Sequence, residues 1–241
     1  MKILGVIPAR YESTRFPGKP LALISGKPMI WWVYNRAKNA VGLDDIYVAT
    51  DDKRIYDVCK ENEMNVVMTS ENIRTGADRV AEVAKIIVAD VYINIQGDEP
   101  LIKPEAIEQI IGYLKRNRDV YYLGLKSRIS DENEWKNYNV VKAITDVNGD
   151  AMYFSREPIP TIFDQSVSHR VMGLYGYRRD FLLTFLELGQ SALEKAERGV
   201  EMLRAMENGY KVRLIDTEYH SIGVDLPEHI IEIENELQRE V

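Results

Sequence analysis

Three positively charged side chains, Arg10, Arg15 and Lys19, stand close together near the N-terminus of the chain. They follow the apolar residues 3–7, which have the pattern of a buried strand, and prolines and a glycine then break the segment into a loop. In an open α/β sheet, ligands bind at the edge formed by the carboxyl ends of the strands. Arginine offers planar pairs of donors and lysine offers a mobile point charge, and both suit phosphate oxygens. The loop therefore predicts a polyphosphate site, although its charge alone also fits a solvated basic loop.

A pair of acidic residues follows a second apolar strand, in the segment Gln96-Gly97-Asp98-Glu99-Pro100. The glycine lets the backbone turn at this point, and the proline ends strand pairing. A carboxylate at the end of a central strand points into the ligand crevice, so Asp98 is a candidate ligand of Mg²⁺, which prefers oxygen donors. Taken by itself, the segment fits an ordinary acidic turn equally well.

Asp225 is the second candidate metal ligand. It lies between Gly223 and Pro227, and this local pattern favours the N-cap of a helix, which needs no functional role. Together with Asp98, however, Asp225 would supply a second carboxylate to a metal-bound triphosphate. Two carboxylates, phosphate oxygens and waters make a magnesium site.

The composition bounds the class of protein. A chain of 241 residues that is 45% hydrophobic suits one α/β domain with a sizeable core. Its formal net charge of −7 argues against general binding to nucleic acid or to an anionic membrane. Cys59 is the only cysteine and there are three histidines, so neither an internal disulfide nor a zinc site is predicted. The chain has no signal-peptide pattern and no apolar run of membrane-spanning length, so we expect a cytoplasmic protein.

Strand and helix patterns alternate through the first half of the chain. The expected strands are residues 2–7, 45–50, 65–69 and 91–96, and the expected helices are residues 28–40, 52–63, 76–88 and 104–118. This β-α repetition predicts a mostly parallel sheet with helices on both faces. Neither the glycine-rich dinucleotide fingerprint nor a P-loop occurs, which argues against those nucleotide-binding classes.

The pattern changes to shorter alternating runs after residue 120, at residues 121–128, 140–145, 151–154 and 172–177. We interpret these runs as mixed or antiparallel strands that form a substrate subdomain. The chain then returns to an expected helix over residues 191–208, a strand over residues 211–216 and a C-terminal helix from residue 227.

Five segments together resemble the 3-deoxy-manno-octulosonate (Kdo) cytidylyltransferase family, also called CMP-Kdo synthetases. They are residues 7–20, Tyr47-Val48-Ala49-Thr50-Asp51, residues 96–100, Tyr153-Phe154-Ser155-Arg156 and Gly223-Val224-Asp225. The segments occur in the family's order and span nearly the whole chain. The resemblance implies a three-layer α/β/α fold of the nucleotide-diphospho-sugar transferase type, with a mostly parallel central sheet and a small mixed-sheet subdomain.

The resemblance also implies how the chain is organised. Residues 1–241 would form a single cytidylyltransferase domain. Its CTP-binding part would cover residues 1–118 and 209–241, and an acceptor and dimerisation subdomain would cover residues 119–208 of a homodimer.

The chemistry implied by the resemblance is attack of the anomeric hydroxyl of a 2-keto-3-deoxy sugar acid on the α-phosphorus of CTP, which releases pyrophosphate. Positioning and charge neutralisation dominate such a step. Lys19, Asp98 and Asp225 would be the catalytic residues, with Mg²⁺ held by the two aspartates. The implied CTP-binding residues are Pro8, Ala9, Arg10, Ser13, Arg15, Lys19 and Arg79, and the implied acceptor-binding residues are Gln96, Arg156, Tyr175 and Glu201.

Departures from the family pattern gather on the acceptor side. The family's Ser-Gly-Thr-Glu-Arg reads Thr75-Gly76-Ala77-Asp78-Arg79 here, and Val171 stands at a position where the family commonly has histidine. His169 is two residues earlier. Because a site built to hydrogen-bond a hydroxyl rejects other ligands, lost polar groups predict a changed preference. The acceptor is therefore predicted to be Kdo or a variant of it. The alternatives are a different anionic acceptor, a related guanylyl- or uridylyltransferase, and a catalytically inactive CTP-binding regulator.

Overall fold

The computed structural model describes residues 1–12, 15–73, 75–220 and 222–239. Seven strands of its main sheet lie in the order β11-β7-β10-β6-β1-β4-β5. Parallel pairing joins β1 (Ile3–Ala9), β4 (Asp45–Thr50), β5 (Val66–Met68) and β6 (Val91–Ile95). The long strand β10 (His169–Arg178) runs antiparallel between β6 and β7 (Tyr122–Arg128), and β11 (Arg213–Asp216) runs parallel to β7.

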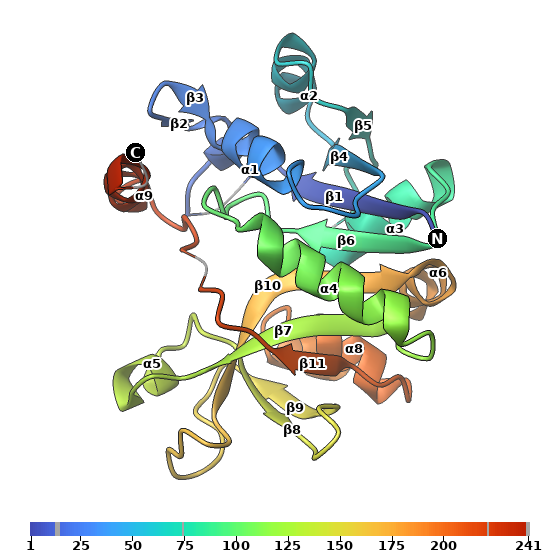
Figure 1. Ribbon diagram of the computed structural model, residues 1–241, viewed down its shortest axis with the longest axis vertical. Helices are drawn as coiled ribbons and strands as arrows, with labels where there is room; N and C mark the ends of the chain where they lie inside the picture. The colour runs from blue at the N-terminus through green and yellow to red at the C-terminus, as the bar shows by residue number, and fades with distance from the viewer. Residues whose placement is uncertain (13–14, 74, 221, 240–241) are drawn as a thin grey trace.

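Helices cover both faces of this sheet, as the sequence predicts (Figure 1). One face carries α1 (Met29–Ala37), α2 (Lys53–Glu61) and α4 (Pro104–Arg116), and the other carries α3 (Gly76–Ile86), α6 (Arg179–Leu188) and α8 (Met202–Glu207). The side-chain period of a strand sends alternate residues to opposite faces. In β1, Ile3 and Ile7 join the core under α1 and α4, whereas Leu4 and Val6 join the core under α3 and α6. The expected three-layer fold with a mostly parallel sheet is confirmed.

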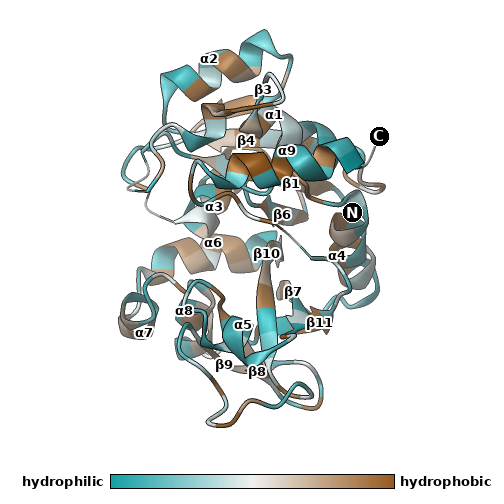
Figure 2. Ribbon diagram, turned by 90° about the vertical axis from the view of Figure 1, so that its left-hand side faces the viewer, coloured by the Kyte–Doolittle hydropathy of each residue, from teal (hydrophilic) through white to brown (hydrophobic). Residues whose placement is uncertain are grey.

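A small antiparallel extension continues from β10 at the lower end of the molecule (Figure 2). It contains β8 (Lys142–Thr145) and β9 (Ala151–Ser155), with the short helix α5 (Glu132–Lys136) nearby. The start of β9 folds back onto the other end of the sheet, since the amide of Ala151 donates to the carbonyl of Val212 at 2.8 Å. Arg213 also reaches Asp150 with its Nε at 2.6 Å. The strands β7, β10 and β8 therefore curl around a shared interior rather than lying flat.

The C-terminal helix α9 (His229–Arg239) packs beside the N-terminal loop. Around it lie the short helix η1 (Lys19–Leu21) and the hairpin of β2 (Leu23–Ile24) and β3 (Lys27–Pro28). Ile24, Met29, Val224 and Ile233 form a third apolar cluster there. The C-terminal helix is thereby held next to the basic loop.

The prediction of one continuous helix over residues 191–208 is wrong. The structure has two short helices, α7 (Ala192–Ala196) and α8, separated by Arg198 and Gly199 with φ of +51° and +85°. This left-handed backbone ends a helix, and glycine adopts it without strain. The helices α5 and α6 were not predicted, because five residues are too few for a periodic signal and α6 directly follows a strand.

Among the described residues, none of the helices combines the length and the apolar character needed to cross a lipid bilayer.

We expect Gly176→Ala to destabilise the fold by about 1–3 kcal/mol, because a methyl group would overpack the core. Its Cβ would lie 2.6 Å from Ile110 Cγ2 and 2.7 Å from Leu114 Cδ1 of α4. The measurement is the free energy of unfolding from urea titration. The matched control is Gly112→Ala in the same helix, where the nearest neighbour is the flexible Arg116 guanidinium at 3.4 Å. That control should be neutral or stabilising by about 0.5–1 kcal/mol, and equal losses in both variants would contradict this account of the packing.

Candidate active site

A cleft of about 400 Å³ opens at the carboxyl ends of β1 and β6. This is the edge at which an open α/β sheet binds its ligands. The residues that line it come from the end of β1, the basic loop and the turn after β6: Pro8, Ala9, Arg10, Glu12, Arg15, Lys19, Pro20, Gln96, Gly97 and Asp98.

Two glycines shape this cleft. A Cβ on Gly97 would stand 2.8 Å from the carbonyl oxygen of Pro8, so only glycine lets the β6 turn approach β1 this closely. Gly18 has a φ of +72°, and its amide donates to the carbonyl of Tyr11 at 2.8 Å. That bond folds the basic loop back on itself and directs Lys19 toward the turn after β6.

Lys19 holds two distant acidic segments together. Its Nζ donates to Asp98 Oδ2 at 2.6 Å and to the carbonyl of Val224 at 2.9 Å. The amide of Val224 in turn donates to the carbonyl of Asp98 at 2.9 Å. The segment that ends the chain is thus fixed beside the turn after β6.

Asp225 contacts a residue that lines this cleft. Its Oδ1 pairs with Arg15 NH2 at 3.0 Å, and its backbone amide donates to Nδ1 of His229, the first residue of α9. The structure therefore brings Lys19, Arg15, Asp98 and Asp225 together. The remaining predicted phosphate ligand of this loop, Ser13, lies outside the described residues.

Arg79 lies behind the cleft and is fully buried. Its NH2 donates to Asp51 Oδ2 at 2.8 Å, and its NH1 donates to the hydroxyl of Thr69. The same Asp51 oxygen is 3.8 Å from Nε of Arg10. Arg79 is therefore placed to orient Arg10 through Asp51 rather than to line the cleft. Asp51 was not among the predicted site residues, although the segment 47–51 was one of the matching motifs.

Gln96, predicted from the resemblance to bind the acceptor, lies against β10. A Cβ on Gly173 would come within 2.7 Å of both Gln96 Cγ and Glu99 Oε1, so this glycine leaves the room that those side chains occupy. Tyr175 follows on the same strand, opposite Asn94 of β6. Burial raises the pKa of Tyr175 well above its usual value, and Tyr177, Glu201 and Glu99 raise it further. Its phenol therefore stays protonated and can donate a hydrogen bond.

Glu201 accepts the first amides of α3. Its two carboxylate oxygens each lie 3.0 Å from a donor, the amides of Gly76 and Ala77. Burial raises the pKa of Glu201 to about 7, although the Ala77 amide opposes this rise. Near neutral pH the carboxyl group can thus be present in either charge state.

Buried ion pairs hold α8 and its Glu201 against α3. Arg204 Nε donates to Glu194 at 2.7 Å, and its NH1 donates to Asp78 at 2.6 Å. Thr75 caps α3, because its hydroxyl accepts the amide of Asp78. The altered segment of residues 75–79 therefore forms the contact between the start of α3 and α8. Ala77, where the family has threonine, is fully buried there.

Arg156 and Val171 lie on the curled strands. The amide of Arg156 donates to Glu197 at 2.9 Å, and its guanidinium lies 5.7 Å from the centroid of the Tyr138 ring. The charge of Arg156 opposes the rise in the pKa of Tyr175. Val171 packs with the apolar core beside Tyr175. His169 does not replace the family's histidine here, because its ring contacts Lys126 instead.

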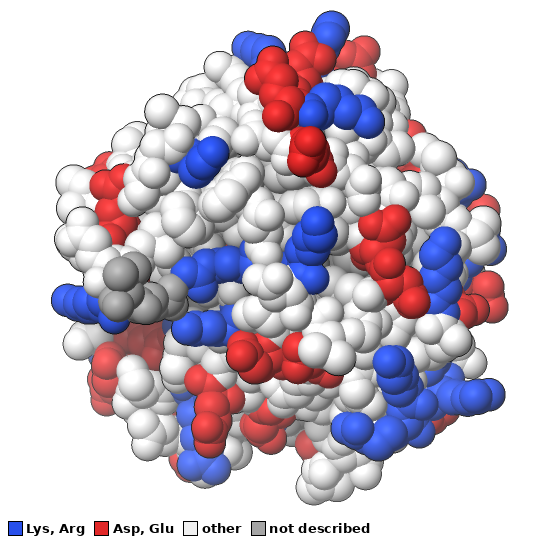
Figure 3. Space-filling view, turned by 45° about the horizontal axis from the view of Figure 1, so that its top comes forward, with Lys and Arg blue, Asp and Glu red and all other residues white. Residues whose placement is uncertain are grey.

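Basic and acidic side chains alternate over this end of the molecule (Figure 3). On the face shown, positive charge is local rather than spread over a large patch. This arrangement suits a small polyphosphate better than a nucleic acid backbone.

We expect Glu201→Gln to flatten the pH dependence of stability between about pH 4.5 and 7. A carboxyl group whose folded pKa is raised stabilises the fold while protonated, and that stability is lost as the pH rises through the folded pKa. The loss should amount to about 1–3 kcal/mol, since the residue as a whole keeps partial contact with solvent. The measurement is the free energy of unfolding at several pH values. Parallel wild-type and variant curves across this window would contradict the raised pKa.

Comparisons with known proteins identify the family of this chain. The family model described as cytidylyltransferase matches residues 4–215. The 3-deoxy-manno-octulosonate cytidylyltransferase of Solibacter usitatus is 50% identical over 232 residues, which is 95% of this chain and 92% of that protein. The enzyme of that name from Geobacter metallireducens is 44% identical over 252 residues and covers 99% of both chains.

A solved structure of CMP:2-keto-3-deoxy-manno-octonic acid synthetase complexed with CTP shares the fold with a TM-score of 0.93. It is 36% identical in sequence, and the match covers 100% of both chains. The resemblance inferred from the five sequence segments is thereby confirmed. This chain belongs to the 3-deoxy-manno-octulosonate cytidylyltransferase family of nucleotidyltransferases.

Proposed function

We propose that this chain transfers CMP from CTP to the anomeric hydroxyl of a 2-keto-3-deoxy sugar acid, Kdo or a variant, and releases pyrophosphate. The observation that supports the proposal is that Lys19, Arg15 and Asp98 line one cleft and that Asp225 pairs with Arg15 beside it. Further support comes from the names of the relatives and from the CTP bound in the similar solved structure.

In this proposal, the triphosphate lies on the basic loop. Arg10, Arg15 and Lys19 neutralise its oxygens, and the backbone of Pro8 and Ala9 forms the floor of the cleft. Ser13 would add a hydroxyl donor from the same loop. Without nucleotide, the carboxylates of Asp98 and Asp225 neutralise Lys19 and Arg15. A bound triphosphate would take over these cations and leave the carboxylates available to a metal.

Asp98 and Asp225 would hold Mg²⁺ in this proposal. Their oxygens are the hard donors that this ion prefers, and they become available to it when a triphosphate takes over Lys19 and Arg15. No cluster of three or more carboxylate, imidazole or thiol side chains suited to a metal occurs within the described ranges. Phosphate oxygens and waters would therefore complete the shell, as is usual for magnesium. When bound, Mg²⁺ would supply charge neutralisation at the reacting phosphate.

The sugar acid would lie between Gln96, Arg156, Tyr175 and Glu201. The guanidinium of Arg156 suits a carboxylate, and the protonated phenol of Tyr175 suits a sugar hydroxyl. Glu201 could donate or accept a hydrogen bond, since its pKa is raised to about 7. Val171 adds an apolar contact at the position where the family commonly has histidine, and this is the strongest reason to test acceptors other than Kdo.

Arg79 contributes to CTP binding in an indirect way in this proposal. It would hold Asp51 in position, and Asp51 would orient Arg10 toward the phosphates.

We further propose a homodimer that associates through residues 119–208. Exposed apolar side chains gather in this part of the chain: Met152, Tyr153, Ile162 and Val167. Residues 1–118 and 209–241 would then form the CTP-binding part. A cytoplasmic location follows from the need for CTP.

We expect Asp98→Asn to lower turnover at least about 100-fold while CTP still binds, because the variant loses charge at the reacting phosphate. The measurements are pyrophosphate release at saturating Mg²⁺ and CTP affinity by calorimetry. The control Asp57→Asn removes an exposed carboxylate paired with Lys53 and should keep full activity. Near-normal turnover of the Asp98 variant would remove this residue from the mechanism.

The function itself is tested by pyrophosphate release with CTP and a panel of acidic sugars. Kdo or a close variant should have the highest kcat/KM, and UTP or GTP should replace CTP poorly. The variant Val171→His should shift preference among the acceptors without changing CTP affinity, because only the acceptor side is altered. Absence of turnover with every acceptor, despite binding of CTP with Mg²⁺, would favour the inactive regulator instead.

A further inference from the structure

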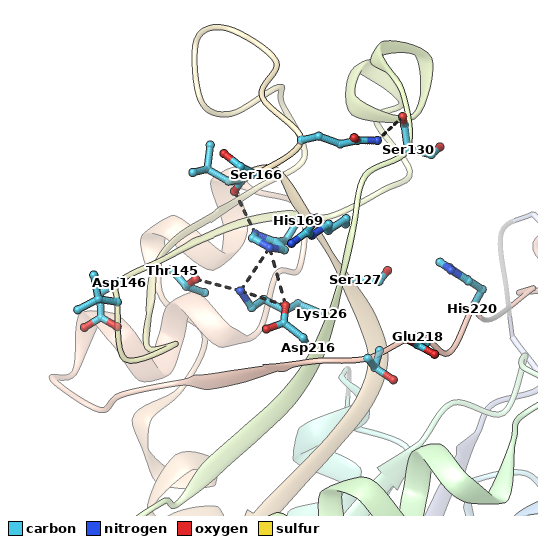
Figure 4. A pocket seen from close by; sticks show the side chains of 15 residues that line it. Lys126, Ser127, Ser130, Thr145, Asp146, Ser166, His169, Asp216, Glu218 and His220 are labelled. Carbon is cyan, nitrogen blue, oxygen red and sulfur yellow. Dashed lines mark hydrogen bonds and ion pairs between the residues drawn. The ribbon is translucent and has the colours of Figure 1, made fainter.

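A second cavity, of about 1000 Å³, opens on the curled strands away from the cleft. Its walls come from β7, β10, the turn after β8, the last residue of β11 and the segment that follows it, as Figure 4 shows. Its lining shares no residue with the lining of the CTP cleft. The proposed reaction leaves this cavity without a role.

A lysine points into this cavity from β7. The side chain of Lys126 is only 8% exposed, and its Nζ lies 3.2 Å from Thr145 Oγ1 and 3.4 Å from His169 Nε2. The nearest carboxylate oxygen, on Asp216, is 3.5 Å away, and the Asp216 side chain is 78% exposed to water. All three contacts are long for an ammonium group, which normally donates at 2.7–2.9 Å to a charged partner. A buried positive charge is thus only weakly compensated.

His169 supports this charge as a neutral ring. Its Nδ1 lies 3.0 Å from the carbonyl of Val167, which can only accept, so Nδ1 carries the ring proton. Nε2 then presents its lone pair to Lys126 and orients the ammonium. Burial and then the charge of Lys126 lower the pKa of His169, while the Val167 carbonyl and Asp216 raise it. The ring is therefore neutral at neutral pH. It accepts a hydrogen bond from Lys126 but carries no negative charge to balance the ammonium group.

Among the residues that the structure describes, three acidic residues line the cavity, Asp146, Asp216 and Glu218, beside the two cations Lys126 and Arg128, so the lining as a whole is not positively charged. Asp216 and Glu218 are both exposed to water. The carboxylate of Asp146 accepts the amides of Asn148 and Asp150 in its own turn, at 2.8 and 2.9 Å. That of Asp216 is mostly in water. Arg128 adds a second positive charge to the lining.

We propose that this cavity binds a small anion through a phosphate or carboxylate group on Lys126, at a site separate from the CTP cleft. The anionic group of the ligand displaces the Asp216 carboxylate and accepts hydrogen bonds from the ammonium group of Lys126. The hydroxyl of Thr145 and those of Ser166 and Thr217 suit the polar body of a sugar acid or sugar phosphate. The volume is at the upper end of the range of small-molecule sites, which leaves room for such a ligand.

The test follows the imidazole resonances of His169 by NMR during separate titrations with inorganic phosphate and with glucuronate. His169 reports on this cavity and not on the CTP cleft, so binding of phosphate at the cleft does not interfere. The expected result is a saturable shift with a Kd of about 1 mM or tighter for at least one probe. Saturation by phosphate alone or by glucuronate alone identifies the preferred anionic group. A shift of equal size with sodium chloride at the same ionic strength overturns the proposal, as does the absence of saturation with both probes.

Three variants complete the test. Lys126→Met should weaken binding at least about tenfold, because it removes the charge that holds the anion. The control Lys211→Met removes a 77% exposed lysine outside the cavity and should bind as the wild type does. Asp216→Asn should tighten binding several-fold, since it removes the competing carboxylate, and it keeps the proposal testable if the Lys126 variant does not fold. Unchanged binding in the Lys126 variant, or weaker binding in the Asp216 variant, overturns the proposal.

Discussion

The contact of Lys19 with Asp98 and with the carbonyl of Val224 is the interaction on which the candidate site depends. It joins the basic loop, the turn after β6 and the segment before α9, which are far apart in the sequence. An ammonium has three donors and no acceptor, so one side chain can bind both acidic segments at once. Because the site lies where the parallel strands β1 and β6 end, the opposed charges stay at the mouth of the cleft instead of being buried in the core.

The contacts of Glu201 are organised by a different constraint, the burial of charged groups between α3 and α8. Arg204 is held by Glu194 and Asp78, and this contact fixes the turn that presents Glu201 to the amides of α3. Buried ionic groups tolerate little displacement, since removing one partner leaves the other uncompensated. The segment of residues 75–79 thus serves the architecture of the site as well as its chemistry. This dual role explains how its composition can differ from the family while the glycine and the arginine stay in place.

Local patterns predicted the elements well where the period of apolar residues is regular. The strands and helices of the first half were located to within a few residues, since each buries one defined face. Prediction failed where tertiary contacts decide the backbone. Arg198 and Gly199 split the expected helix of residues 191–208, because the pairing of Glu194 with Arg204 brings α7 back against α8. For the same reason β10 begins at His169 and ends at Arg178, beyond the expected residues 172–177, since it pairs with β6, β7 and β8 in turn.

The sequence by itself determined the class of the protein. Local properties of the sequence include the order of its strands and helices, the cations of the first loop and the acidic turn after β6. The order of the five matching motifs along the chain indicated the family. Tertiary structure alone decided the partners of each charge. From local pattern Asp225 was best read as a helix cap, whereas folding places it against Arg15. Arg79 was expected to bind CTP, and in the structure its guanidinium donates to Asp51. Lys126 contacts His169 because their strands, β7 and β10, lie side by side. The physical reason is that the distance between two charged groups depends on how segments far apart in the sequence pack together. The spacing of residues within one segment does not determine that distance.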